Sequence, residues 1–137
     1  MSVQADDLIG LARQASERAY APYSGFRVGA ALLCENGVRF SGCNIENASY
    51  GLSICAERAA VFAAVAAGER SFRALAVYTE SDEPGPPCGA CLQVLREFAV
   101  DMPIYLAGRS GARREVSLAV LYPMPFGPAA LAGQGKD

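Results

Sequence analysis

The chain has 137 residues, of which 52% are hydrophobic and 19% are charged, and its formal net charge is −2. This length fits one domain over residues 1–137, and the composition excludes a disordered chain. The slight acidity and the lack of a dense Lys/Arg cluster argue against a nucleic-acid partner, while the absence of a ~20-residue apolar run or a signal-peptide pattern predicts a cytoplasmic protein that binds no membrane.

The first third of the chain predicts a helix followed by a β-hairpin. Over residues 6–20, apolar side chains recur at three- and four-residue steps, which is typical of a helix with one buried face. The apolar runs 26–34 and 38–43 flank Asn36-Gly37, and Asn-Gly between two such runs is a strong hairpin signal. We therefore expect an antiparallel strand pair here.

The middle of the chain predicts two helices separated by a strand. The Ala-rich run 54–67 is too long for a strand, and Gly68 is placed to end a helix there. Residues 73–79 form a short apolar run typical of a central strand. A loop rich in Pro and Gly then leads to a second helical pattern over residues 88–100. Both predicted helices carry a cysteine near their first turn.

The last third of the chain predicts two further strands, over residues 103–106 and 116–121, and then a Pro-rich tail without regular structure. The whole order is therefore helix, strand, strand, helix, strand, helix, strand, strand. Such an order predicts an α/β fold, a three-layer α/β/α sandwich around a mixed five-stranded sheet.

The cysteines are the main chemical signal. There are five, an odd number that suits metal ligands or buried thiols better than a disulfide framework. The chain has no histidine, which excludes Ser-His and Cys-His hydrolases. Cys88-Gly89-Ala90-Cys91 alone is compatible with a redox pair, half of a structural zinc site, or chance. Cys55, near the start of the other inner helix, can supply a third sulfur.

Three protein ligands leave a fourth zinc position open for water, whereas a structural zinc site closes it. We predict the open site with Cys55, Cys88 and Cys91 as ligands. The alternative is that Cys34 or Cys43 completes a four-cysteine structural site. These two cysteines lie on the predicted hairpin strands, distant in sequence, and are better interpreted as small buried residues.

Glu57 follows Cys55 by two residues, so a helix start would place its carboxylate beside the open metal position. A carboxylate there can move protons between water, a ring nitrogen and a leaving amine. The alternative is an exposed glutamate favoured by the helix dipole. Arg58 is the candidate donor that draws charge from the thiolates, the alternative being a surface arginine.

Four segments, taken in order, resemble the small cytidine deaminases over nearly the whole chain. They are residues 23–32, residues 42–50, Cys55-Ala56-Glu57-Arg58, and Pro87-Cys88-Gly89-Ala90-Cys91. The resemblance implies one Zn²⁺ per chain and hydrolytic deamination of cytidine and 2′-deoxycytidine to the uridine products in pyrimidine salvage, with release of ammonia.

The resemblance also implies the substrate contacts. Asn44 and Glu46 would hydrogen-bond the ribose, Phe26 would pack against the nucleoside, and the backbone at Ala56 would read the base together with Glu57. Tyr50, the last residue of the segment 42–50 that resembles the family's ribose-binding segment, would also contact the substrate. Phe126 would stack on the base from a neighbouring subunit of a homotetramer. The slightly high apolar content, with many Ala and Val at helix positions, favours an oligomer independently.

One departure from the family pattern is Leu92, which stands where the family often has Arg and leaves Arg58 to offset thiolate charge alone. Three alternatives stay open at this point. A related deaminase could act on another cytosine nucleoside, such as a blasticidin-type antibiotic. A nucleic-acid deaminase would need a basic groove and usually a histidine ligand. A non-catalytic zinc-stabilised oligomer or a redox protein would not need Glu57.

Overall fold

Five strands form one mixed sheet in the order β2-β1-β3-β4-β5 in this computed structural model, which describes residues 2–134. The central strand β3 (Phe72–Thr79) pairs antiparallel with β1 (Val28–Cys34) and parallel with β4 (Pro103–Gly108). The antiparallel edge strands are β2 (Arg39–Cys43), next to β1, and β5 (Arg113–Ser117), next to β4. The mixed five-stranded sheet is therefore confirmed.

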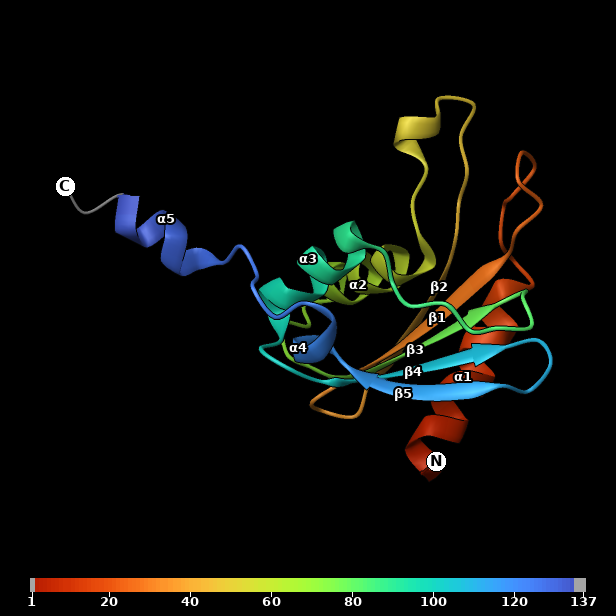
Figure 1. Ribbon diagram of the computed structural model, residues 1–137, viewed down its shortest axis with the longest axis horizontal. Coiled ribbons are helices and arrows are strands. Elements are labelled where there is room, and N and C mark those ends of the chain that lie inside the picture. Colours follow the sequence, from red (N-terminus) through yellow and green to blue (C-terminus); the bar gives the residue numbers. More distant parts are fainter. Residues whose placement is uncertain (1, 135–137) are drawn as a thin grey trace.

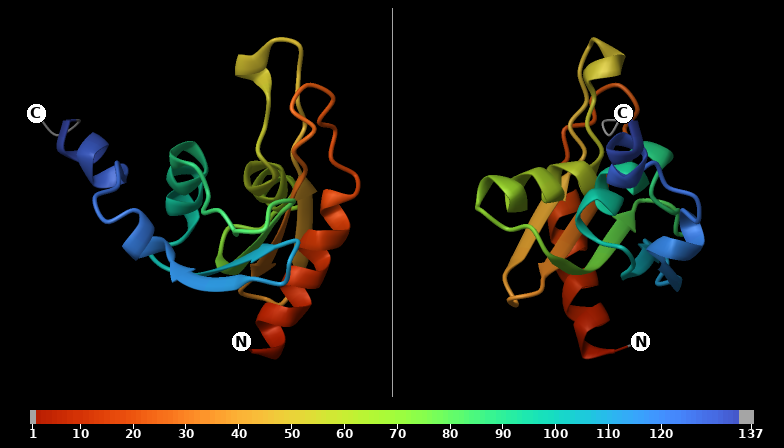
Figure 2. Two further views of the ribbon diagram at one scale, coloured as in Figure 1. Left: turned by 45° about the vertical axis from the view of Figure 1, so that its right-hand side comes forward. Right: turned by 90° about the vertical axis from the view of Figure 1, so that its left-hand side faces the viewer.

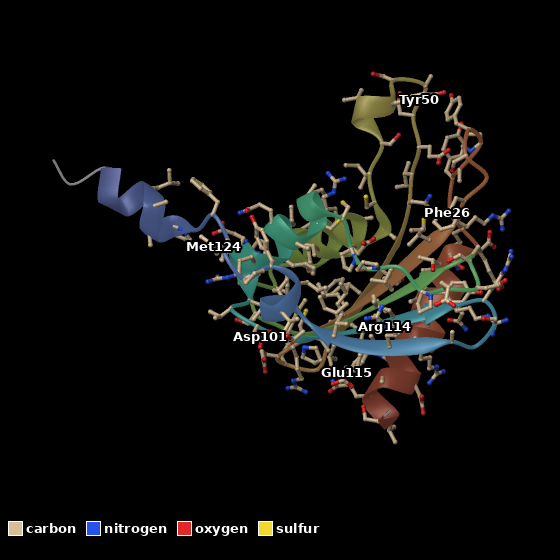
Figure 3. The ribbon with its side chains drawn as sticks, viewed as in Figure 1. Phe26, Tyr50, Asp101, Arg114, Glu115 and Met124 are labelled. Carbon is tan, nitrogen blue, oxygen red and sulfur yellow. The ribbon has the colours of Figure 1, made fainter. Side chains whose placement is uncertain are left out.

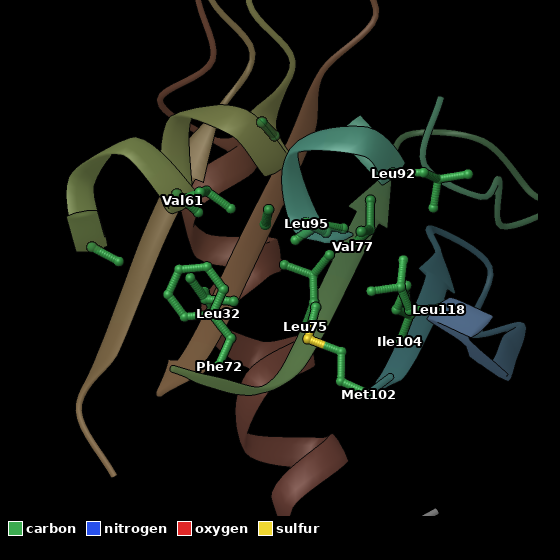
Figure 4. Close-up of a cluster of buried hydrophobic side chains, with 14 of the residues drawn as sticks. Leu32, Val61, Phe72, Leu75, Val77, Leu92, Leu95, Met102, Ile104 and Leu118 are labelled. Atoms are coloured by element: carbon green, nitrogen blue, oxygen red, sulfur yellow. The ribbon is translucent and has the colours of Figure 1, made fainter. Parts of the chain in front are cut away.

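Helices cover both faces of this sheet (Figures 1 and 2). The helix α1 (Val3–Ser16) lies on one face, and α2 (Ala56–Ala66) and α3 (Gly89–Phe98) lie on the other. Successive strand residues point to opposite faces, so β1 and β3 each contribute to two cores. The core under α1 is mostly alanine, whereas the core under α2 and α3 holds larger side chains, among them Leu32, Leu75, Val77 and Leu95 (Figure 4). The predicted three layers are confirmed.

Two glycines let the helices approach the sheet closely. A Cβ on Gly29 of β1 would lie 1.8 Å from the carbonyl oxygen of Ala12 in α1. A Cβ on Gly42 of β2 would lie 2.5 Å from the backbone nitrogen of Ala60 in α2. Since both contacts are with helix backbone, no side chain can turn aside to make room. These glycines thus determine how near α1 and α2 lie to the sheet.

Two predictions about the C-terminal part are wrong. Residues 116–121 are not one strand, because β5 ends at Ser117 and the short helix α4 (Leu118–Leu121) follows. The Ser117 hydroxyl accepts from Val120 N at 3.2 Å and Asp101 Oδ1 accepts from Ala119 N at 3.0 Å, so side chains cap this helix where a strand would need a neighbour. The tail is also not wholly irregular, since α5 (Pro128–Gln134) begins at a proline, which suits the first helical position.

The first helix, predicted over residues 6–20, begins at Val3 and ends at Ser16 in the structure. The Ser16 hydroxyl donates to Arg13 O at 2.6 Å. Residues 20–27 and 44–55 then rise together above the sheet (Figure 1), joined by hydrogen bonds from Tyr20 N to Asn44 O and from Glu46 N to Tyr20 O. The second segment carries the 3₁₀ helix η1 (Tyr50–Leu52).

Within residues 2–134, no helix is both long and apolar enough to span a membrane.

Candidate active site

The three predicted ligands meet where the two inner helices begin. Cys55 is the residue that caps the N-terminus of α2, and Cys88 caps that of α3, while Cys91 lies in the first turn of α3. Neither capping side chain makes the usual hydrogen bond to its own helix. Both sulfurs are therefore free to bind something else, and the unpaired N–H groups of the first helical turns favour the thiolate form.

The sulfur spacing fits a zinc ion. Cys88 Sγ lies 3.6 Å from Cys91 Sγ and 3.9 Å from Cys55 Sγ. In a tetrahedral site with Zn–S bonds of about 2.3 Å, neighbouring sulfurs are about 3.8 Å apart. The three sulfurs thus form one face of a tetrahedron, and no fourth protein ligand joins them in the part of the chain that the structure describes. This is the donor set of a zinc site with one position open for water.

The other two cysteines do not approach this cluster. Cys34 is fully buried at the far end of β1, in the core under α2, and burial raises the pKa of its thiol. Cys43 ends β2 and lines a separate hollow near α1. Neither joins the group of three sulfurs found among residues 2–134, so the alternative of a four-cysteine structural site is wrong.

Glu57 lies in the first turn of α2 and is only 5% exposed. Burial is the largest influence on its carboxyl group and raises its pKa above the usual range, and the nearby Cys55 adds to this rise. The alternative, an exposed glutamate at a helix start, is therefore wrong for this position. A buried carboxyl group with a raised pKa, beside the three sulfurs, is suited to accept and return a proton.

Arg58 contacts the sulfur cluster directly. Its Nη2 donates to Cys55 Sγ at 3.4 Å, and its Nε is buried without a hydrogen-bond partner. Hydrogen bonds with Cys91 and Arg58 lower the pKa of the Cys55 thiol to about 5. Leu92, by contrast, packs into the core under α2 and α3 (Figure 4). The Arg58 guanidinium therefore lies where it can offset thiolate charge.

A cavity of about 380 Å³ opens beside the cluster. It is lined by Cys55, Glu57 and Cys88 and by the polar residues Asn44 and Glu46. Much of the remaining wall is apolar, formed by Phe26, Val28, Ile54, Ala56, Val77 and Pro86. This volume and lining suit a flat, partly polar small molecule.

Asn44 and Glu46 also stabilise the loop that carries Phe26. Asn44 Oδ1 accepts from Val28 N at 2.9 Å, and its Nδ2 donates to Phe26 O at 2.8 Å. Glu46 Oε1 accepts from Tyr23 N and Ser24 N at 3.0 and 3.1 Å, and the Ser24 hydroxyl, the largest influence, lowers the pKa of this carboxyl group. Each side chain retains hydrogen-bonding capacity toward the cavity, so turn chemistry and ligand contact are compatible.

Two predicted substrate residues do not line this cavity. Tyr50 lies at the tip of the segment that rises above the sheet, 74% exposed, with its ring 5.8 Å from that of Tyr23 (Figure 3). Phe126, on the C-terminal arm two residues after Met124 (labelled in Figure 3), is 56% exposed and does not line the cavity. Within one chain, therefore, neither completes the site.

Sequence reasoning missed three polar residues near the site. Thr79 and Ser81 line the cavity, and strand alternation from Val77 could have placed Thr79 on this face. Gln93 in α3 contacts the C-terminal arm: its Nε2 donates to Phe126 O at 2.8 Å, and its Oε1 accepts from the Tyr122 hydroxyl. No local pattern signals the contacts of Gln93, because its partners lie about 30 residues away.

Comparison with known proteins identifies similar chains. Residues 2–107 match the family described as the cytidine and deoxycytidylate deaminase zinc-binding region. The cytidine deaminase of Sporosarcina psychrophila is 50% identical over 122 residues, which cover 88% of this chain and 90% of that protein. The cytidine deaminase of Mycobacterium tuberculosis is 45% identical over 102 residues, 71% of this chain and 77% of that protein.

Solved structures agree in fold. The crystal structure of cytidine deaminase from Burkholderia pseudomallei superposes with a TM-score of 0.85 at 49% identity, covering 92% of this chain and 100% of that one. The crystal structure of cytidine deaminase from Mycobacterium tuberculosis gives a TM-score of 0.79 at 40% identity, with 92% and 99% of the two chains covered.

Proposed function

The chain belongs to the cytidine and deoxycytidylate deaminase zinc-binding family, and we propose that Glu57 moves the protons while the enzyme deaminates its nucleoside. The chain is a zinc-binding hydrolase with cytidine deaminase activity. We propose that its single catalytic domain spans residues 1–137 and also accepts 2′-deoxycytidine. The observation that carries the proposal for Glu57 is a buried carboxyl group beside three sulfurs in the wall of one cavity.

The residues that line the cavity orient the substrate. Asn44 and Glu46 provide hydrogen-bonding groups for the ribose, while Phe26 packs against the nucleoside. The backbone at Ala56 and the Glu57 side chain then face the N3 edge of the base. This orientation places C4 of the pyrimidine at the sulfur cluster, where the reaction must take place.

Zinc held by Cys55, Cys88 and Cys91 would supply Lewis-acid activation of water. Glu57 accepts one proton from that water and delivers it to N3 of the ring while the water oxygen bonds to C4. It then takes the second proton of this oxygen and delivers it to the amine, and the C4–N bond breaks to release ammonia. Arg58 donates to Cys55 Sγ and thereby reduces the negative charge of the three thiolates. Cytidine and water are consumed, and uridine and ammonia are formed.

We also propose that active sites are shared between the subunits of a homotetramer. The C-terminal arm exposes Met124, Phe126 and Leu131, which have no apolar cover within the described chain. Gln93 holds the start of this arm away from the cavity of its own subunit. Phe126 would then close the site of a neighbouring subunit, where an exposed aromatic ring can stack on the base.

The decisive experiment follows the loss of cytidine absorbance in the ultraviolet, with Glu57→Gln as the matched variant. Conversion to uridine by the unmodified protein, but not by a zinc-replete Glu57→Gln protein, supports the proposed role of Glu57. Conversion of a blasticidin-type antibiotic without conversion of cytidine would instead favour the alternative substrate. Sedimentation of the unmodified protein tests the tetramer separately.

A further inference from the structure

Thr79, the last residue of β3, contributes a buried polar group to the wall of the cavity. Its side chain points to the same face as Val77, toward α2 and α3, and is only 7% exposed. It lines the cavity together with Glu57 and Cys88. The mechanism described above gives this hydroxyl no task, and its one hydrogen-bond partner among the described residues is the Ser81 hydroxyl.

The hydrogen bonds of Thr79 have a direction. Ser81 Oγ donates to the carbonyl oxygen of Glu83 at 2.6 Å, and a carbonyl oxygen can only accept. A hydroxyl has one proton, so Ser81 has none left for Thr79. In the 3.1 Å contact between the two hydroxyls, Thr79 must therefore be the donor. This leaves Thr79 Oγ1 with free lone pairs and no free proton: it is an acceptor only.

The loop that imposes this direction is anchored to the sheet. Arg109 N donates to Ser81 O at 2.9 Å, and the Ser110 hydroxyl donates to Asp82 O at 3.0 Å. A Cβ on Gly108 would lie 2.6 Å from Ser81 O, so β4 and this loop are in close contact. The orientation of the Ser81 hydroxyl is therefore supported by the turn between β4 and β5.

We propose that Thr79 Oγ1 accepts a hydrogen bond from the 4-amino group of the bound base and so distinguishes substrate from product. This proposal rests on the orientation in the proposed function, with N3 facing Glu57 and C4 at the sulfurs. The group on C4 then points toward the wall formed by the end of β3 and residues 80–87. An amine at that position offers N–H donors, whereas the oxo group of uridine offers only lone pairs, which the lone pairs of Thr79 repel.

The test compares Thr79→Val, which keeps the shape and removes the acceptor, with the unmodified enzyme. We measure KM for cytidine and the inhibition constant of uridine, together with zinc content and Tm. We expect KM to rise about two- to tenfold and uridine to bind as tightly as before or more tightly, so that the ratio of the two constants moves toward the product. Thr79→Ser, which keeps the hydroxyl, should leave this ratio unchanged.

Ser81→Ala provides a second, opposite test. Without Ser81 Oγ the Thr79 proton is free to turn into the cavity, so uridine should bind several-fold more tightly while KM for cytidine changes less. If Thr79→Val loses zinc or folds poorly, the same two constants are compared between Ser81→Ala and Thr79→Ser, which retains the hydroxyl. An unchanged ratio in zinc-replete Thr79→Val or Ser81→Ala overturns the role of Thr79. Failure of the unmodified enzyme to convert cytidine would overturn the proposed function instead.

Discussion

At the scale of single residues, the environment of Glu57 determines what the site can do. Most acidic side chains in a chain of this size are solvated, but Glu57 is buried between a helix start and a sulfur cluster. Its raised pKa shows that the fold disfavours the ionised form. Arg58, the next residue, is partly buried and donates to a sulfur of the cluster. We therefore assign proton transfer and charge compensation to two consecutive side chains in our proposal.

Glu57→Gln should abolish turnover without damaging the fold. We expect kcat to fall about 10²- to 10⁴-fold, since the amide cannot carry a proton, while zinc content is unchanged. Because burial raises the carboxyl pKa, its favourable contribution to stability is lost as pH rises from the unfolded value of about 4.3 through the folded value. At pH 7 the uncharged glutamine should therefore leave Tm unchanged or raise it. Thermal unfolding beside the activity assay checks both points, and a large drop in Tm would contradict this explanation.

Arg58→Gln should weaken zinc binding. Removing the guanidinium leaves the three thiolates with less charge compensation, and partners that hydrogen-bond to metal ligands typically change affinity 10- to 100-fold. Zinc transfer to a chromogenic chelator measures this effect independently of activity. The matched control is Arg73→Gln, which removes an exposed arginine paired with Glu35. Equal zinc release from the two variants would show that Arg58 is only a surface residue.

At the scale of elements, the site depends on how closely helices approach the sheet. The start of α2 carries Cys55 and that of α3 carries Cys88, and both helices pack on the same face. Gly42 permits the close contact of α2 with β2, and Gly29 that of α1 with β1. Gly42 therefore helps to position Cys55 without touching the metal, whereas Gly29 positions α1, which carries no ligand.

Gly29→Ala should destabilise the protein strongly, because its Cβ would overlap the backbone of α1. We expect a loss of about 3 kcal/mol in the free energy of unfolding, at the upper end of overpacking effects. Gly10→Ala is the matched control in α1 itself: nothing lies near its added Cβ, so it should stabilise the helix by about 0.5–1 kcal/mol. Denaturant unfolding compares the two. If Gly29→Ala were as stable as Gly10→Ala, the close contact would not exist.

At the scale of the whole molecule, one chain carries the three cysteines and Glu57 in one site. It does not place there the Phe126 ring, which we propose closes the site over the substrate. Phe126 does not line the cavity of its own chain, and its side chain is exposed. An arm with exposed apolar side chains is costly for an isolated chain, since such surface favours association. This is why we place the completed site between subunits.

Mixing two defective variants tests this arrangement. Phe126→Ala keeps Glu57, the proposed proton carrier, but lacks the aromatic ring that would close a neighbouring subunit's site. Glu57→Gln keeps this ring but lacks the proton carrier. After dissociation and reassembly of the mixture, some sites should combine an intact Glu57 with an intact Phe126. We expect turnover at low cytidine to exceed the sum of the two variants measured alone. Activity equal to that sum would show that each chain covers its own site.

Hydrophobic periodicity and cysteine spacing were enough to predict the layers, most elements and the three metal ligands. Hydrophobic periodicity is a local property, and so is the position of Cys88 and Cys91 within one helical turn. The strand predicted over residues 116–121 failed because the caps that turn it into α4 come partly from Asp101, a distant residue. Local apolar content cannot reveal such a partner.

The three-dimensional structure was needed to show which side chains lie close together and which are buried. It brought Cys55 within 3.9 Å of Cys88, buried Glu57, and excluded Cys34 and Cys43 from the site. It also revealed the hydroxyl pair Thr79–Ser81 and its direction. The physical reason is that burial, pKa and hydrogen-bond direction depend on neighbours that are distant along the chain, and these meet only when the helices pack on the sheet.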